Sequence, residues 1–135
     1  MTETILFSLE ESGTRGVEYV LDRAQQRDGS VHALAVVDTA RYGEPALSSG
    51  EVVVDEAEDR ATERLRAFVA RARDRGIPVE TARQHGRLAE QLPACADEVD
   101  ADVVVCPRRI PHGARRRLER TAETVVAPLE EPAVA

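Results

Sequence analysis

Val31-His32-Ala33-Leu34-Ala35-Val36-Val37 and Val103-Val104-Val105-Cys106 are the two stretches that decide the fold. Both are nearly continuous runs of apolar residues, which is typical of parallel strands that helices cover on both faces. A strand with one face in water would instead alternate apolar and polar residues. The two runs therefore predict a parallel sheet in the middle of the molecule.

Around these runs, the spacing of apolar residues alternates between that of a strand and that of a helix. Ile5-Leu6-Phe7-Ser8-Leu9 predicts a first strand, and Val79 to Gln84 predicts a weaker and more polar one. Four further segments repeat apolar residues at i, i+3, i+4 and i+7, as one face of a helix does. Their stripes are Val17, Val20, Leu21 and Ala24; Ala57, Ala61, Leu65, Phe68, Val69 and Ala72; Leu88, Leu92, Cys95 and Val99; and Leu118, Ala122, Val125 and Val126.

Capping and helix-breaking residues give the boundaries of these elements. Ser12 or Thr14 is expected to cap the first helix, which ends before Gly29. Residues 39–54 are interrupted by glycine, proline and serine and predict a loop. The second helix is then expected to run over residues 55–75.

The elements follow the order β-α-β-α-β-α-β-α, with the stub of a final strand at Pro132 to Ala135. Pro93 is expected to start or kink the third helix, because proline lacks the N–H of the helical ladder. Regular alternation predicts a single α/β domain over residues 1–135, built on an open, mostly parallel five-stranded sheet with helices on both faces. Ligands of such sheets bind at the carboxyl ends of the strands, near the point where the strand order reverses.

Length and composition argue against several classes of protein. The chain has 135 residues, of which 42 % are hydrophobic, and a domain of this size can form a core without disulfides or metal. No stretch approaches the about 18 consecutive apolar residues of a membrane span, and the acidic start lacks the pattern of a signal peptide. Cys95 and Cys106 each lie in an apolar stretch, so we expect reduced core thiols in a cytoplasmic protein.

The charge is acidic overall and unevenly distributed. The formal net charge is −7, which argues against a general nucleic-acid binder. All 18 basic residues are arginine, a bias that fits either adaptation to a salt-rich cytoplasm or a GC-rich coding sequence. Residues 1–63 carry 14 acids and 5 arginines, whereas residues 108–120 carry six arginines and one acid, Glu119.

Five short segments occur in the order in which one protein family has them. They are Leu9-Glu10-Glu11-Ser12, Val36-Val37-Asp38, Gly86-Arg87-Leu88-Ala89-Glu90, Ala101-Asp102 before the buried run, and Thr121-Ala122-Glu123-Thr124-Val125. Universal stress proteins typically have Val-Asp-Gly-Ser, Val-Val-Asp, Gly-x-Pro-Ala-Glu, Ala-Asp and a helix with Ser-x-x-Glu-x-Val at these places. Because the order of the five is specific, the chain resembles the universal stress protein family over essentially its whole length.

The resemblance implies a Rossmann-like fold of the adenine-nucleotide alpha-hydrolase type. It further implies a small cytoplasmic protein that regulates a stress response through a protein client. The acidic net charge and the lack of a long apolar stretch lead us to expect neither nucleic acid nor membrane as a partner. Members of the family pair through their last strand. We therefore expect a homodimer that forms through residues 125–135.

ATP-binding members of the family carry Gly-x-x-Gly, nine residues, and then Gly-Ser or Gly-Thr, so that backbone amides can approach the phosphates. Pro107 and Ile110 stand at the two glycine positions here, and Glu119-Arg120-Thr121 replaces the later pair. Pro107 has no N–H to donate, and a carboxylate at Glu119 would repel phosphate. We therefore expect no bound cofactor and, in particular, no ATP bound in the usual way.

The candidate site is one for a nucleotide or another anion, in which arginine side chains replace the glycine amides. Guanidinium groups bind phosphate through paired hydrogen bonds, and the arginine cluster follows the fourth predicted strand, where this fold places ligands. Two other interpretations remain: a solvated face that pairs with acidic residues or a second subunit, and a basic segment that docks on an acidic protein. The candidate binding residues are Glu10, Ser12, Val37, Arg108, Arg109 and Arg115.

The sequence offers neither a catalytic constellation nor a metal site. Ser8 and Ser12 lack both a nearby His–Asp pattern and a Gly-x-Ser-x-Gly context. The three histidines and two cysteines do not have metal-ligand spacing. We therefore expect a protein that is not an enzyme, with slow nucleotide hydrolysis as the open alternative.

Overall fold

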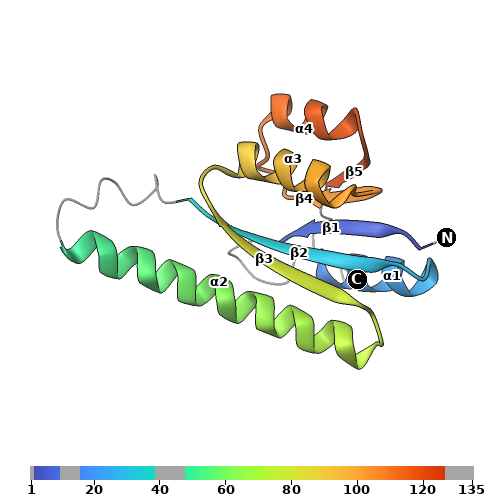
Figure 1. Ribbon diagram of the computed structural model, residues 1–135, viewed down its shortest axis with the longest axis horizontal. Helices are drawn as coiled ribbons and strands as arrows, with labels where there is room; N and C mark the ends of the chain where they lie inside the picture. Colours follow the sequence, from blue (N-terminus) through green and yellow to red (C-terminus); the bar gives the residue numbers. More distant parts are fainter. Residues whose placement is uncertain (1, 10–15, 39–47, 127–135) are drawn as a thin grey trace, which may run out of the picture.

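The computed structural model describes residues 2–9, 16–38 and 48–126. Strands and helices alternate strictly along this part of the chain (Figure 1). The strands are β1 (Thr4–Ser8), β2 (Ser30–Val37), β3 (Val79–His85), β4 (Val103–Cys106) and β5 (Glu123–Val126). The helices are α1 (Val17–Gln26), α2 (Ser48–Asp74), α3 (Leu88–Val99) and α4 (His112–Glu119).

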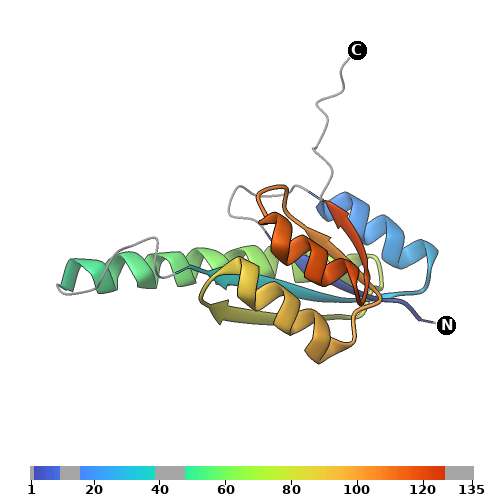
Figure 2. The same ribbon diagram turned by 90° about the horizontal axis from the view of Figure 1, so that it is seen from above.

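The five strands form one parallel sheet in the order β3-β2-β1-β4-β5. Strands β2 and β3 follow one another on one side of β1, and β4 and β5 follow one another on its other side. Helices α1 and α2 cover one face of the sheet, and α3 and α4 cover the other (Figures 1 and 2). The predicted α/β fold with an open parallel sheet is confirmed.

The core has two apolar layers because successive side chains of a strand point to opposite faces. Phe7 of β1 is fully buried on the face that α1 and α2 cover, and its ring centroid lies 5.4 Å from that of Phe68 on α2. Leu6 and Val104 are buried on the opposite face with Leu118 of α4. The continuous apolar runs of the sequence thus correspond to strands that are covered on both sides.

The last strand differs from the prediction. Helix α4 ends at Glu119, and residues 123–126, which the helical stripe assigned to a helix, form β5. Three consecutive β-branched residues follow Glu123, and such residues favour strands. Val125 packs on the α1 side of the sheet and Val126 on the α3 side, which is the alternation of a strand. The final strand predicted at residues 132–135 lies outside the described residues.

Two helix starts also differ from the prediction. Gly16, with a φ of 84°, occupies the N-cap position of α1 instead of Ser12 or Thr14, which lie outside the described residues. Helix α2 already begins at Ser48, so residues 48–54 of the predicted loop are helical. Serine and glycine are tolerated there because the first N–H groups of a helix make no intrahelical bonds.

Three further sequence features have a clear place in the structure. Pro93 lies inside α3 and is buried, so it does not start that helix. Cys95 and Cys106 are both buried and neither forms a disulfide. No helix within the described ranges combines the length and apolar character that crossing a bilayer requires.

Candidate functional site

The strand order reverses between β1 and β4, which are neighbours in the sheet although nearly a hundred residues separate them. In open parallel sheets the carboxyl ends of two such strands flank the ligand crevice. The chain leaves β4 at Cys106, and the next turn carries Arg108 and Arg109, both exposed. These two predicted site residues therefore lie together at the carboxyl edge of the sheet, the edge that binds ligands in folds of this kind.

In the turn between β4 and α4, a backbone hydrogen bond forms within the turn itself. Pro107 is buried and has no N–H, and the N–H of Ile110 donates to the carbonyl oxygen of Pro107 at 3.2 Å. The side chain of Ile110 is only 8 % exposed and packs in the cluster that contains Ala114 and Leu118. Neither position that carries glycine in ATP-binding relatives thus presents a free amide to a phosphate.

Of the other candidate residues, the structure describes Val37 and Arg115. Val37 is 4 % exposed, belongs to the core, and accepts a hydrogen bond from the Gly86 N–H through its carbonyl oxygen at 3.0 Å. Arg115 lies on α4, and its Nε is 4.0 Å from Oε2 of Glu119, one helical turn away. Glu10 and Ser12 lie outside the described residues. Among the described candidate residues, Arg108 and Arg109 are therefore the pair whose exposed side chains directly follow the end of β4.

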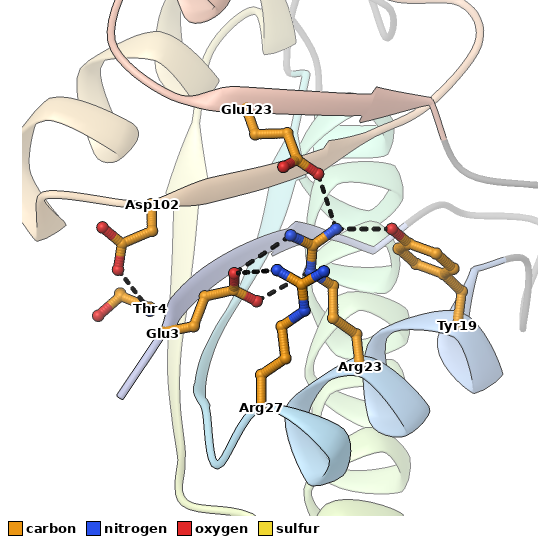
Figure 3. A network of polar contacts seen from close by, with 7 residues as sticks. All are labelled: Glu3, Thr4, Tyr19, Arg23, Arg27, Asp102 and Glu123. Atoms are coloured by element: carbon orange, nitrogen blue, oxygen red, sulfur yellow. Dashed lines mark hydrogen bonds and ion pairs between the residues drawn. The ribbon is translucent and has the colours of Figure 1, made fainter. Parts of the chain in front are cut away.

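A second polar cluster, which the sequence did not predict, lies at the opposite end of the sheet (Figure 3). Arg23 of α1 is only 8 % exposed and holds Glu3 through two hydrogen bonds of 2.8 and 3.1 Å. Its Nη1 also donates to Glu123 of β5 at 2.7 Å and to the hydroxyl of Tyr19 at 2.9 Å. Arg27 adds a 3.2 Å contact to Glu3. This Arg23 network ties α1 to the residue preceding β1 and to the edge strand β5.

The sequence carries one signal of this network. Tyr19, Arg23 and Arg27 repeat at every fourth residue, which places them on one face of α1. Their partners could not be found in the same way, because Glu3 is 20 and Glu123 is 100 residues away from Arg23. Only the register of the finished sheet brings the two carboxylates together.

The Arg23 network should make folding stability depend on acidic pH. The guanidinium of Arg23 holds the pKa values of Glu3 and Glu123 below their ordinary value of 4.5. At acidic pH the unfolded chain therefore binds more protons than the folded one. The stabilisation is complete above that ordinary value and is lost as the pH falls through it toward the lower folded values.

We expect the unfolding free energy measured with urea to fall between about pH 6 and pH 3. The variant Glu123→Gln should lose less over the same interval, because it lacks one of the two carboxylates. The difference between wild type and variant should therefore shrink as the pH falls. A difference that stays constant over the whole interval would show that Glu123 contributes nothing to the pH dependence.

Within the described ranges, no three histidine, cysteine, aspartate or glutamate side chains are arranged to hold a metal ion. At the carboxyl end of β4, Arg108 and Arg109 expose guanidinium groups. Chemically, such groups bind anions by charge and by paired hydrogen bonds.

Comparisons with known proteins agree with this architecture. The sequence profile of the universal stress protein family matches residues 1–134. No curated protein matches the sequence. A universal stress protein structure from Burkholderia pseudomallei is 23 % identical, with 93 % of this chain and 96 % of that chain covered and a TM-score of 0.75.

Two further similar structures hold nucleotides. The universal stress protein from Archaeoglobus fulgidus in complex with dAMP is 19 % identical, covers 93 % of this chain and 98 % of that one, and has a TM-score of 0.67. A universal stress protein family member from Arabidopsis thaliana with AMP bound is 15 % identical, covers 98 % and 97 %, and has a TM-score of 0.66. The match of the family profile over nearly all residues, together with this shared fold, shows that the chain belongs to the universal stress protein family.

Proposed function

We propose that this chain is a cytoplasmic regulatory protein of the stress response that does not hold ATP through the amides of a phosphate loop. The observation that carries this proposal is the turn after β4. Pro107 lacks an N–H, and the N–H of Ile110 is already bonded to the Pro107 carbonyl oxygen. A regulator of this kind acts through a protein client rather than through turnover of a substrate.

The second candidate function is binding of a nucleotide or another anion by arginine side chains. Two neighbours in the comparison hold dAMP and AMP, and Arg108 and Arg109 are exposed beside the end of β4. Guanidinium forks match phosphate oxygens without any contribution from the backbone. Slow hydrolysis of a bound nucleotide belongs to this second candidate only.

Titration calorimetry with ATP and with AMP separates the two functions. Without amides to donate at positions 107 and 110, ATP loses two charge-assisted hydrogen bonds to its phosphates, which costs about 3–6 kcal/mol of binding free energy. A loss of this size moves a micromolar affinity into the millimolar range. We therefore expect no heat of ATP binding at micromolar protein concentration. Micromolar binding of ATP that survives the double variant Arg108→Ala/Arg109→Ala would contradict both proposals.

Binding that the double variant abolishes would support the arginine site and overturn the first proposal. The matched control is Arg73→Ala, which removes an exposed arginine from the last turn of α2. Because α2 leads into the start of β3, this residue lies at the amino edge of the sheet. The control should leave any nucleotide binding unchanged.

We further propose that the protein is a homodimer that pairs through residues 125–135. Support comes from the place of β5 at the edge of the sheet, where its outward backbone N–H and C=O groups have no neighbouring strand among the described residues. Val125 and Val126 are only half-buried there, so a second copy could cover them. Residues 127–135 lie outside the described part of the chain, and β5 is therefore the portion of this interface that can be tested by design.

A further inference from the structure

The opposite edge of the sheet is β3, whose outward backbone groups can be identified. The N–H of Val31 donates to the carbonyl oxygen of Pro78, and the N–H of Gly86 donates to that of Val37, both at 3.0 Å. In a parallel ladder, every second residue directs its backbone groups to the same neighbour. Backbone groups of the even-numbered residues from 78 to 86 thus face β2, so the N–H and C=O of Thr81 and Arg83 point to the outer edge of β3.

A groove runs beside this edge, between β3 and α2. Its volume is about 620 Å³. Leu65 and Val69 of α2 provide apolar lining, and three arginines supply charge: Arg66, Arg73 and Arg83. Among the described residues that line the groove, none is acidic. An apolar groove with a cationic rim therefore adjoins a strand that no other described strand covers on its outer side.

The arginines are spaced along the direction of the strand. Arg66 and Arg73 lie two helical turns apart on α2, a rise of about 10 Å. Arg83 donates from Nη1 to the Thr62 hydroxyl at 2.8 Å, and its Nη2 is 3.8 Å from the carboxylate of Glu58. Arg66 contacts Glu63 at 3.3 Å in an exposed ion pair, which is weak and can exchange partners. The groove is thus a cationic surface on a chain whose net charge is −7.

We propose that the β3 edge and this groove bind an extended acidic segment of a partner protein as an added strand. The backbone of the segment pairs with the outward N–H and C=O groups of Thr81 and Arg83. Alternate side chains of an added strand project to the same face, so those on the α2 side enter the groove. Aliphatic side chains contact Val69, and carboxylates reach Arg66 and Arg73.

Charge favours an acidic partner over a second copy of this chain. A two-fold axis at this edge would place the same surface of both copies face to face. Arg66, Arg73 and Arg83 of one copy would then lie near their equivalents, and like charges across paired strands are destabilising. An acidic segment meets the same arginines with complementary charge.

The test measures, by fluorescence anisotropy, the binding of a fluorescein-labelled peptide of about eight residues. The peptide repeats Val-Val-Glu-Glu, so that valine and glutamate alternate on each face of the added strand. We expect saturable binding that weakens as salt is added. The double variant Arg66→Ala/Arg73→Ala should bind about tenfold more weakly, because it lacks two screened ion pairs. The control Arg116→Ala/Arg117→Ala removes the same charge from exposed positions on α4 and should bind as wild type does.

Thr81→Pro tests the backbone pairing. Because the N–H of Thr81 faces the open edge, proline there spares the ladder with β2, and thermal unfolding checks that the fold is kept. We expect at least about tenfold weaker binding by Thr81→Pro and unchanged binding by Thr81→Ala, which retains the N–H. Four results would overturn the proposal. Two of them concern the variants: equal weakening by Arg116→Ala/Arg117→Ala, and unchanged binding by Thr81→Pro. The other two are equally tight binding of a peptide with lysine in place of glutamate, and self-association that Thr81→Pro abolishes.

Discussion

Replacement of Arg23 by alanine should lower the unfolding free energy by about 3 kcal/mol. Arg23 uses four of its donor positions on Glu3, Glu123 and Tyr19, and its side chain is only 9 % exposed. The variant leaves the Glu3 carboxylate, which is 15 % exposed, without its paired hydrogen bonds. Removal of one partner from a buried ion pair costs more than the pair contributes, because the other charge stays desolvated.

Thermal unfolding measures this effect as a fall in Tm of about 10 °C for a domain of this size. The matched control is Arg27→Ala, because Arg27 contacts the same carboxylate but is 57 % exposed. Exposed ion pairs contribute less than about 1 kcal/mol, so this variant should lose only a few degrees. Equal losses in the two variants would show that burial of Arg23 adds nothing to the strength of the network.

The parts of the fold that were predicted correctly are those with long or strongly periodic segments. Residues 31–37 and 103–106 are apolar throughout, and an open parallel sheet is one of few ways to cover both faces of such strands. Strand β5 was missed because it has four residues, and Val125 and Val126 also fit the helical stripe that Leu118 begins. A pattern so short does not distinguish a period of 3.6 from a period of two.

The start of α2 was missed for a different physical reason. Ser48, Ser49 and Gly50 are typical of loops, yet the first turn of a helix imposes few hydrogen-bonding demands on them. Local propensity is therefore weakest as a guide at helix ends. The apolar stripe from Ala57 to Ala72, where tertiary packing decides the conformation, was predicted correctly.

For the candidate site, the sequence could place residues along the chain but could not decide which of them point to one another. The arginines after β4 follow directly from the strand pattern, and the structure places Arg108 and Arg109 exposed in that turn. That Val37 is buried and that its carbonyl oxygen is bonded to Gly86 depend on the register between β2 and β3. The same dependence on register kept the partners of Arg23 out of reach of sequence reasoning.

The proposed dimer can be tested at β5 without damage to the sheet. The N–H of Glu123 donates to the carbonyl oxygen of Asp102 at 3.0 Å, so the backbone groups of Glu123 and Val125 face β4. Those of Thr124 therefore point to the open edge. Proline at position 124 removes an outward N–H and leaves the ladder with β4 intact.

We expect Thr124→Pro to raise the dimer dissociation constant at least about tenfold, because a strand pairing across a two-fold axis loses the bond from each copy. Sedimentation equilibrium at micromolar concentration should then show mostly monomer, with a Tm that confirms the fold. Thr124→Ala keeps the N–H and should remain dimeric, as should Thr81→Pro at the opposite edge of the sheet. Deletion of residues 131–135 should also give monomer if the tail adds area to the interface. A Thr124→Pro variant that stays fully dimeric would place the interface away from β5, and loss of the dimer in Thr81→Pro would place it at β3.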